Sequence, residues 1–335
     1  MLAGGASLSL CSLQRSQAIW RAGVGLLGLA LALSFLNPEQ ATGEEGKLPN
    51  PLAGRLTLSS APEFSSGDYG QSENTEVWYV PFSAKYEFSD LAITSYDRDR
   101  LSFKITIPFI RIDGPSGIIW GTGAPIVGSG RGQSAGPGGG GPVVPIETID
   151  SEESGLGDLI VSASYGIRPP VESPLPWFLV SAKVKIPTAS ESKGLGTGKA
   201  DYTVFSEIYK PMGQIGFFVG GGYRFMGDPK DFELQNRWLA SVGLDLEISN
   251  RVGVGVSYDY REGATSSSPD AHEISPWITI HLDRGLRVDP YAVFGLSNGS
   301  PSYGAGLRFS WSTRTNVSSS LEERPNALAR TTQSN

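Results

Sequence analysis

Apolar and polar positions alternate along most of this chain. From about residue 101 to about residue 311, stretches of about ten alternating residues are separated by turn residues. In the segment 251–261, the even-numbered positions are Val252, Val254, Val256, Tyr258 and Tyr260. The odd-numbered positions from 253 on are Gly253, Gly255, Ser257, Asp259 and Arg261. Because successive side chains on a strand point to opposite faces, the pattern predicts strands with one apolar and one hydrophilic face.

Strand length favours a membrane protein over a soluble β-sandwich, which shows the same alternation. Soluble strands average roughly 5–6 residues, whereas a tilted strand needs about 9–11 to cross a bilayer. Aromatic residues also gather near the expected strand ends, as in the interfacial girdles of membrane barrels: Trp177, Trp238, Tyr258, Tyr260, Tyr303, Phe309 and Trp311. The sequence therefore predicts an all-β protein, a transmembrane antiparallel up-and-down β-barrel.

The turn residues divide the barrel into about twelve strands, with ten or fourteen as alternatives. The expected strands are 55–61, one within 76–96, 101–112, 157–168, 177–186, 201–209, 214–225, 237–248, 252–261, 273–282, 286–296 and 302–311. Long connections (187–200, 226–236, 262–271, 297–300) alternate with short ones (210–215, 249–251, 283–285). Since outer-membrane barrels have short periplasmic turns and longer outer loops, the alternation also predicts orientation.

We expect the barrel over residues 44–311. Three segments lack the strand pattern, one before the barrel, one within it and one after it. Residues 1–43 have the form of a signal peptide and cleavage zone, with an apolar run Ala22–Leu36 after Arg15 and Arg21. As a membrane anchor this run falls short of the ~20 residues needed. Residues 114–154 are glycine-rich and predict an outer loop, and 312–335 form a polar tail expected to be disordered. We therefore expect export to the outer membrane of a Gram-negative-type cell.

The hydrophilic face carries many ionisable residues. We expect the following to face the lumen: Lys104, Arg168, Lys183, Lys185, Arg224, Asp245, Glu247, Asp259, Arg261, His281, Asp289 and Arg308. A dry core tolerates such charges only in pairs, so they indicate either a water-filled lumen or ion pairs that brace the wall. The net charge of −7 argues against a nucleic-acid partner.

Catalytic and metal-binding patterns are weak. A histidine and a serine, His272 and Ser275, are close enough in sequence to suggest a barrel lipid hydrolase, but nucleophilic catalysis needs an oriented base at hydrogen-bonding range. The loop 193–200 is similar to a phosphate loop but has Lys193 in place of the first glycine and Ala200 in place of the hydroxyl residue. No Cys/His cluster has zinc spacing. We expect no enzyme activity and no cofactor or metal.

Short glycine-rich phrases in a fixed order carry a family resemblance. They are Ile107-Pro-Phe109, Gly155-Leu-Gly-Asp-Leu159, Lys185-Ile-Pro-Thr188, Gly194-Leu-Gly-Thr-Gly198 and Asp201-Tyr-Thr203. Over about residues 75–311 the chain resembles the outer-membrane protein family named for the meta-pathway of phenol degradation. The resemblance implies a transporter barrel for aromatic or other hydrophobic compounds, without catalytic residues. The loop 114–154 and the polar tail depart from the family pattern.

The expected function is therefore a channel for passive uptake of small, aromatic or hydrophobic solutes. Its expected partners are outer-membrane lipid and the solute. The alternative is a structural or interaction barrel with a plugged lumen, which conductance would distinguish. The assignment of faces is testable, because arginine at Val254 or Val256 should destabilise the barrel and arginine at Ser257 should be tolerated.

Overall fold

The computed structural model describes residues 53–69, 74–88, 100–117, 145–169, 173–229, 233–266 and 268–315. The predicted signal peptide and nearly all of the predicted polar tail lie outside these residues. The described chain is almost entirely β-structure, with two short 3-10 helices, η1 (Glu191–Lys193) and η2 (Asp283–Gly285). Within these ranges, no helix has the length and apolar character required to cross a membrane.

The strands follow one another along the chain with few interruptions. They are β1 (Gly54–Ser60), β2 (Glu63–Gly67), β3 (Thr75–Phe88), β4 (Arg100–Gly117), β5 (Pro145–Leu156), β6 (Leu159–Ile167), β7 (Trp177–Ile186), β8 (Asp201–Met212), β9 (Ile215–Phe225), β10 (Arg237–Glu247), β11 (Val252–Arg261), β12 (Ala271–His281), β13 (Leu286–Gly295) and β14 (Tyr303–Thr315). Strands β7 and β11 coincide with the strands expected from the sequence.

These strands form a closed antiparallel barrel of twelve wall positions, as predicted. Strands β1 and β2 occupy one position, since both pair with β14 and with β3, and Ala61-Pro62 interrupts them. Proline lacks the N–H that a continuous ladder needs, which fits its place at this break. Strands β5 and β6 likewise share a position beside β4, with Gly157-Asp158 between them. The pairing of β1 with β14 closes the barrel and leaves no free edge there.

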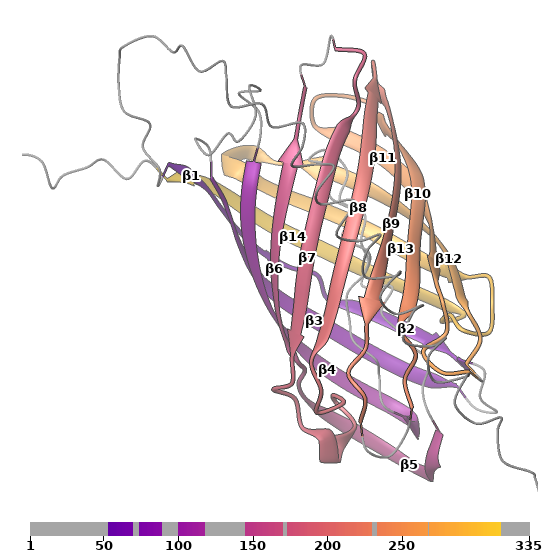
Figure 1. The fold of residues 1–335 in the computed structure, drawn as a ribbon. Helices are drawn as coiled ribbons and strands as arrows, with labels where there is room; N and C mark the ends of the chain where they lie inside the picture. Colours follow the sequence, from indigo (N-terminus) through magenta and orange to yellow (C-terminus); the bar gives the residue numbers. More distant parts are fainter. Residues whose placement is uncertain are drawn as a thin grey trace, which may run out of the picture.

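The two ends of the barrel differ in their connections. At one end, here called the turn end, β8 and β9 are joined by residues 213–214, β10 and β11 by 248–251, and β12 and β13 by 282–285. At the other, the loop end, longer connections cover 187–200, 226–236, 262–270 and 296–302. Figure 1 shows the strongly inclined strands, with β1 at the upper left near the turn end and β5 at the lower loop end. The predicted alternation is therefore present, with two longer connections at the turn end, 89–99 and 168–176, as exceptions.

Burial alternates along the strands as the sequence pattern predicts. On β10 and β11, Leu244 and Val256 are exposed on the outer face, whereas Ser241, Ser257 and Asp259 are buried on the inner face. Exposed apolar side chains recur on the outer face of the other wall strands as well. A closed barrel satisfies its backbone hydrogen bonds internally, so such an outer face suits contact with lipid.

The structure corrects the predicted outer loop. Strand β4 continues to Gly117, and β5 takes in residues 145–156, so 114–117 and 145–154 belong to a strand pair rather than to the loop 114–154. Glycine and proline hid the strand signal at 114–117, and the acidic residues Glu147, Asp150, Glu152 and Glu153 hid it at 145–154, because these residue types are depleted in strands. Strand β14 likewise extends to Thr315, beyond the predicted barrel boundary at residue 311.

The predicted aromatic girdle is on the outer face with one exception. Trp238, Tyr258, Tyr303, Phe309 and Trp311 are exposed, and Tyr260 is partly exposed on the same face of β11. Trp177 instead points into the barrel. Its ring packs 5.2 Å from the ring of the buried Tyr209, and its Nε1–H donates to the Pro169 carbonyl at 3.1 Å. Its position at the end of a strand did not predict which face of the barrel it lies on. The face depends on whether the residue occupies an odd or an even position along the strand.

Candidate functional site

The candidate site is the inner face of the barrel and its loop-end mouth. The structure places each of the charged residues expected in the lumen on this inner face or at its ends. Lys104, Lys183, Lys185, Arg224, Asp245, Glu247, Asp259, Arg261, His281, Asp289 and Arg308 share the inward parity of their strands, and Arg168 follows β6 with its guanidinium over the inward Trp177 ring. Which of these side chains meets a solute is a separate matter.

Some of these charges are ion-paired across the wall. Arg261 forms a bidentate pair with Glu273 on the neighbouring strand β12, with Nη1 donating to Oε2 at 3.0 Å. Arg287 donates from Nε to both oxygens of Asp289, at 2.7 and 2.9 Å, and Arg308 lies 3.9 Å from the same carboxylate. Burial of unpaired charge costs several kcal/mol per ion, so these pairs brace the wall.

Lys104 and Lys183 contrast with this pattern. Lys104 is exposed and Lys183 partly exposed, although both point inward. Within the described ranges, neither has a carboxylate at salt-bridge distance, whereas Lys85 on β3 holds Glu87 at 3.1 Å. Two cations without counter-ions indicate that solvent reaches this part of the interior.

Large aromatic side chains also line the inside. Tyr209, Phe218, Trp277 and Tyr291, from β8, β9, β12 and β13, are buried in one cluster with Val293. We call the four rings the aromatic wall. Phe218 and Trp277 approach to 6.4 Å between ring centroids. A Cβ on Gly255 would overlap the Trp277 ring, so glycine on the neighbouring strand lets this ring lie flat.

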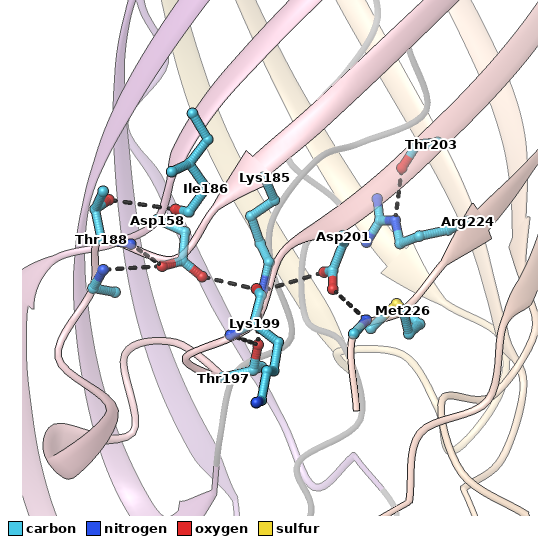
Figure 2. A network of polar contacts seen from close by, with 12 residues as sticks. Asp158, Lys185, Ile186, Thr188, Thr197, Lys199, Asp201, Thr203, Arg224 and Met226 are labelled. Atoms are coloured by element: carbon cyan, nitrogen blue, oxygen red, sulfur yellow. Dashed lines mark hydrogen bonds and ion pairs between the residues drawn. The ribbon is translucent and has the colours of Figure 1, made fainter. Parts of the chain in front are cut away.

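A rim network at the loop end joins three wall strands and two loops (Figure 2). The buried Lys185 ammonium on β7 lies 3.1 Å from Asp158, just before β6, and 3.2 Å from Asp201 on β8. It also donates to Thr197 Oγ1 at 3.0 Å. We call Asp158, Lys185, Asp201 and Thr197 the rim latch.

Backbone groups of the loops complete the rim latch. Asp158 Oδ1 accepts the N–H groups of Thr188 and Ala189 at 3.0 and 2.9 Å. Asp201 Oδ1 accepts the Gly227 N–H at 3.1 Å, which attaches the next loop. Charge-assisted hydrogen bonds of this kind are stronger than neutral ones, so the latch holds both loops against the wall.

The glycine-rich phrases noted in the sequence meet in this latch. Four of them supply Asp158, Lys185 with Thr188, Thr197 and Asp201. A Cβ on Gly196 would lie 2.9 Å from the Asp158 carboxylate oxygens and 2.8 Å from the Ala189 Cβ. The phrases therefore encode a close-packed rim turn at the loop end of the barrel.

The same loop contributes an apolar contact inside the mouth. Leu195 is buried in a cluster with the inward-facing Val77 and Tyr79 of β3 and Ile110 and Ile112 of β4. Among the described residues, the loop 187–200 thus packs against the inner wall through Leu195. The shape of the mouth on this side follows from the latch and from this contact.

The hydrolase alternative fails on geometry. His272 has outward parity on β12 and lies with its Nδ1 at hydrogen-bonding distance from the Tyr258 hydroxyl, whereas Ser275 is buried on the inner face. A histidine outside the barrel cannot take the proton of a serine inside it, and a base at hydrogen-bonding range is required. Within the described chain, no group of His, Cys, Asp and Glu is placed to hold a metal ion.

Several inner charges were missing from the sequence-based set. They are Glu63, Lys85, Glu87, Asp201, Glu207, Arg237 and Glu273, all with inward parity. The parity of β8 could have revealed Asp201 and Glu207. However, Phe205 and Tyr209 share that parity, so both faces of β8 contain apolar residues and the alternation alone does not separate them.

A closed twelve-position barrel with an apolar outer face and a charged interior defines an outer-membrane-type transmembrane β-barrel. The chain belongs to the family described as "Putative MetA-pathway of phenol degradation", whose profile matches residues 59–313. The resemblance read from the glycine-rich phrases is thereby confirmed.

A solved structure with a TM-score above 0.5 shows the same fold. The COG4313 outer membrane channel from Pseudomonas putida F1 shares 14% identity with a TM-score of 0.57, over 82% of this chain and 100% of that one. The translocator domain of the autotransporter NalP from Neisseria meningitidis shares 9% identity over 90% of this chain and 98% of that domain, with a lower TM-score of 0.37. No curated protein matches the sequence. At such identities the likeness concerns the fold.

Proposed function

We propose that this protein is a passive channel for small solutes in the outer membrane. The observation that carries the proposal is the exposed, inward-pointing Lys104 within a closed barrel whose outer face is apolar. A lysine with no carboxylate partner among the described residues keeps its charge inside the barrel only if water reaches it. The name of the similar P. putida protein, an outer membrane channel, supports the same reading.

The solutes we propose are small aromatic or otherwise hydrophobic compounds. Two observations support this class. The family is described by a pathway of phenol degradation. The four rings of the aromatic wall give the inner side of the barrel an aromatic lining that is 1–7% exposed, and a ring–ring contact with an aromatic ligand contributes about 0.5–1.5 kcal/mol beyond burial of area.

The runner-up is a barrel with a plugged lumen that serves a structural or interaction role. The braced pair Arg261–Glu273 and the approach of Phe218 to Trp277 favour it, because both fill interior space. This alternative and the channel share the outer face, the fold and the rim latch. Only the passage of ions or solutes separates them.

Conductance of the purified protein in planar bilayers tests the proposal. We expect stepwise currents from protein that also shows the altered gel mobility of a folded barrel before boiling. Folded protein without any current would favour the plugged barrel. Export by the N-terminal signal is a linked proposal. Sequencing the N-terminus of mature protein tests it, and retention of Ala22–Leu36 would contradict it.

A further inference from the structure

Three lysines lie in one row on the inner wall, and among the described residues none of their register partners is acidic. Lys85 on β3 is the direct register partner of Lys104 on β4. Lys104 is in turn opposite Ser162 on β6, and Ser162 is opposite Lys183 on β7. Residues directly opposite are about 4.5–5.5 Å apart, and like charges so placed destabilise the sheet. We call Lys85, Lys104, Ser162 and Lys183 the lysine row.

Among the described residues, one of these lysines has a carboxylate at salt-bridge distance. Glu87 pairs with Lys85 at 3.1 Å. The charged groups that act on Lys104 are Arg308 and Lys85, and those that act on Lys183 are Arg224 and Lys104, all of them cations. Since both lysines also keep access to solvent, the wall carries positive charge that an anion in the lumen could relieve.

The lysine row lies near the aromatic wall. Arg308 lies between the two groups. Its charge is close enough to act on the Lys104 ammonium, and its guanidinium carbon lies 5.9 Å from the centroid of the Tyr291 ring. Tyr291 belongs to the aromatic wall. Lys104, Arg308 and the Tyr291 ring, which is 7% exposed, therefore lie in the same region of the inner wall.

From this juxtaposition we infer that the channel prefers aromatic anions, with a carboxylate at Lys104 and Lys183 and a ring toward the aromatic wall. The inference rests on the proposed channel function and adds the charge of its substrate class. Charge-assisted hydrogen bonds from lysine would hold the carboxylate, and the aromatic ring supplies the contact that a simple anion lacks.

Reversal potentials across a KCl gradient test the charge preference. We expect the wild-type channel to prefer chloride, and Lys104→Gln with Lys183→Gln to reduce the chloride-to-potassium permeability ratio by about tenfold. The matched control is Lys193→Gln, which removes the same charge from the rim, where Lys193 lies 3.9 Å from Glu153. The control should behave as wild type. The inner double variant should fold, because it removes a repulsion.

Block of the chloride current by added solutes shows whether the channel recognises the charge of a solute, its aromatic ring, or both. Benzoate should block at lower concentration than acetate, which lacks the ring, and than benzyl alcohol, which lacks the charge. The double variant should lose the advantage of benzoate over benzyl alcohol. A conducting wild type without anion preference, or equal benzoate block in wild type and double variant, would overturn the inference and leave the channel standing. A folded barrel that conducts nothing would overturn both.

Discussion

Replacement of Lys185 by methionine tests the rim latch most directly. The substitution keeps a similar side-chain length but removes the only cation held between Asp158 and Asp201. Both carboxylates stay buried, at about 5% and 4% exposure of their side chains. The Thr197 hydroxyl also loses the Lys185 donor.

The expected cost follows from the geometry of the triad. Since one nitrogen lies 3.1 Å from one carboxylate oxygen and 3.2 Å from the other, these oxygens are separated by about 6 Å at most. Two unit charges at that distance repel by about 3 kcal/mol at an effective dielectric constant of about 20. Loss of one partner of a buried pair typically costs about 3–5 kcal/mol. We therefore expect Lys185→Met to lower the free energy of unfolding by about 3–5 kcal/mol.

Urea unfolding in lipid vesicles measures this cost. Lys193→Gln is the matched control, because its contact with Glu153 is 3.9 Å long and exposed, and such pairs contribute about 0–1 kcal/mol. Adding Asp158→Asn and Asp201→Asn to Lys185→Met should recover part of the loss, since the carboxylates no longer repel. Limited proteolysis should also cut the loop 187–200 faster in the single variant. If Lys185→Met cost no more than Lys193→Gln, the latch would not hold the rim.

Three further outcomes are expected. Gly255→Ala should destabilise the barrel by about 1–3 kcal/mol because its Cβ would overlap the Trp277 ring, whereas Gly253→Ala on the same strand has its nearest contact at 3.4 Å and should be nearly neutral in the same titration. Val256→Arg should cost about 2–4 kcal/mol near the bilayer midplane, whereas the inward Gly253→Arg should be tolerated and shift the reversal potential; equal costs would contradict the assigned faces. Purified protein in detergent should give a β-rich circular dichroism spectrum, and a helical spectrum would refute the barrel.

The structure changes the choice of the inner position for the arginine substitution. Alternation alone made Ser257 the tolerant inner position. In the structure, Ser257 is about 2% exposed and donates to Asp259 Oδ2 at 2.7 Å, so arginine there would displace a packed contact. Gly253 lies on the same face, and a Cβ there would make an ordinary contact, 3.4 Å from the Leu246 carbonyl oxygen. Facing is a local property, but room for a side chain depends on the neighbouring strands.

The fold was largely predictable because the barrel repeats a local rule. Apolar and polar positions alternate with a period of two, so the outer face of β11, the strand count and the order of short turns and long loops all follow from the sequence. The rule weakened where inner positions are apolar or glycine-rich. It therefore misplaced Trp177 and missed Glu207 behind Phe205 and Tyr209. The acidic residues of β5 interrupted the alternation and left that strand inside a predicted loop.

The candidate site depended on contacts that no local pattern contains. The glycine-rich phrases could be quoted from the sequence, but only strand register brings Asp158 to Lys185, 27 residues later. Closure of the barrel also sets Tyr291 beside Glu63, where its hydroxyl donates at 2.8 Å across 228 residues of chain. The sequence by itself determined which face each alternating side chain takes, because successive residues on a strand point in opposite directions. Tertiary structure alone decided which charges pair and which lysines stay without a counter-ion, because pairing depends on the register between strands.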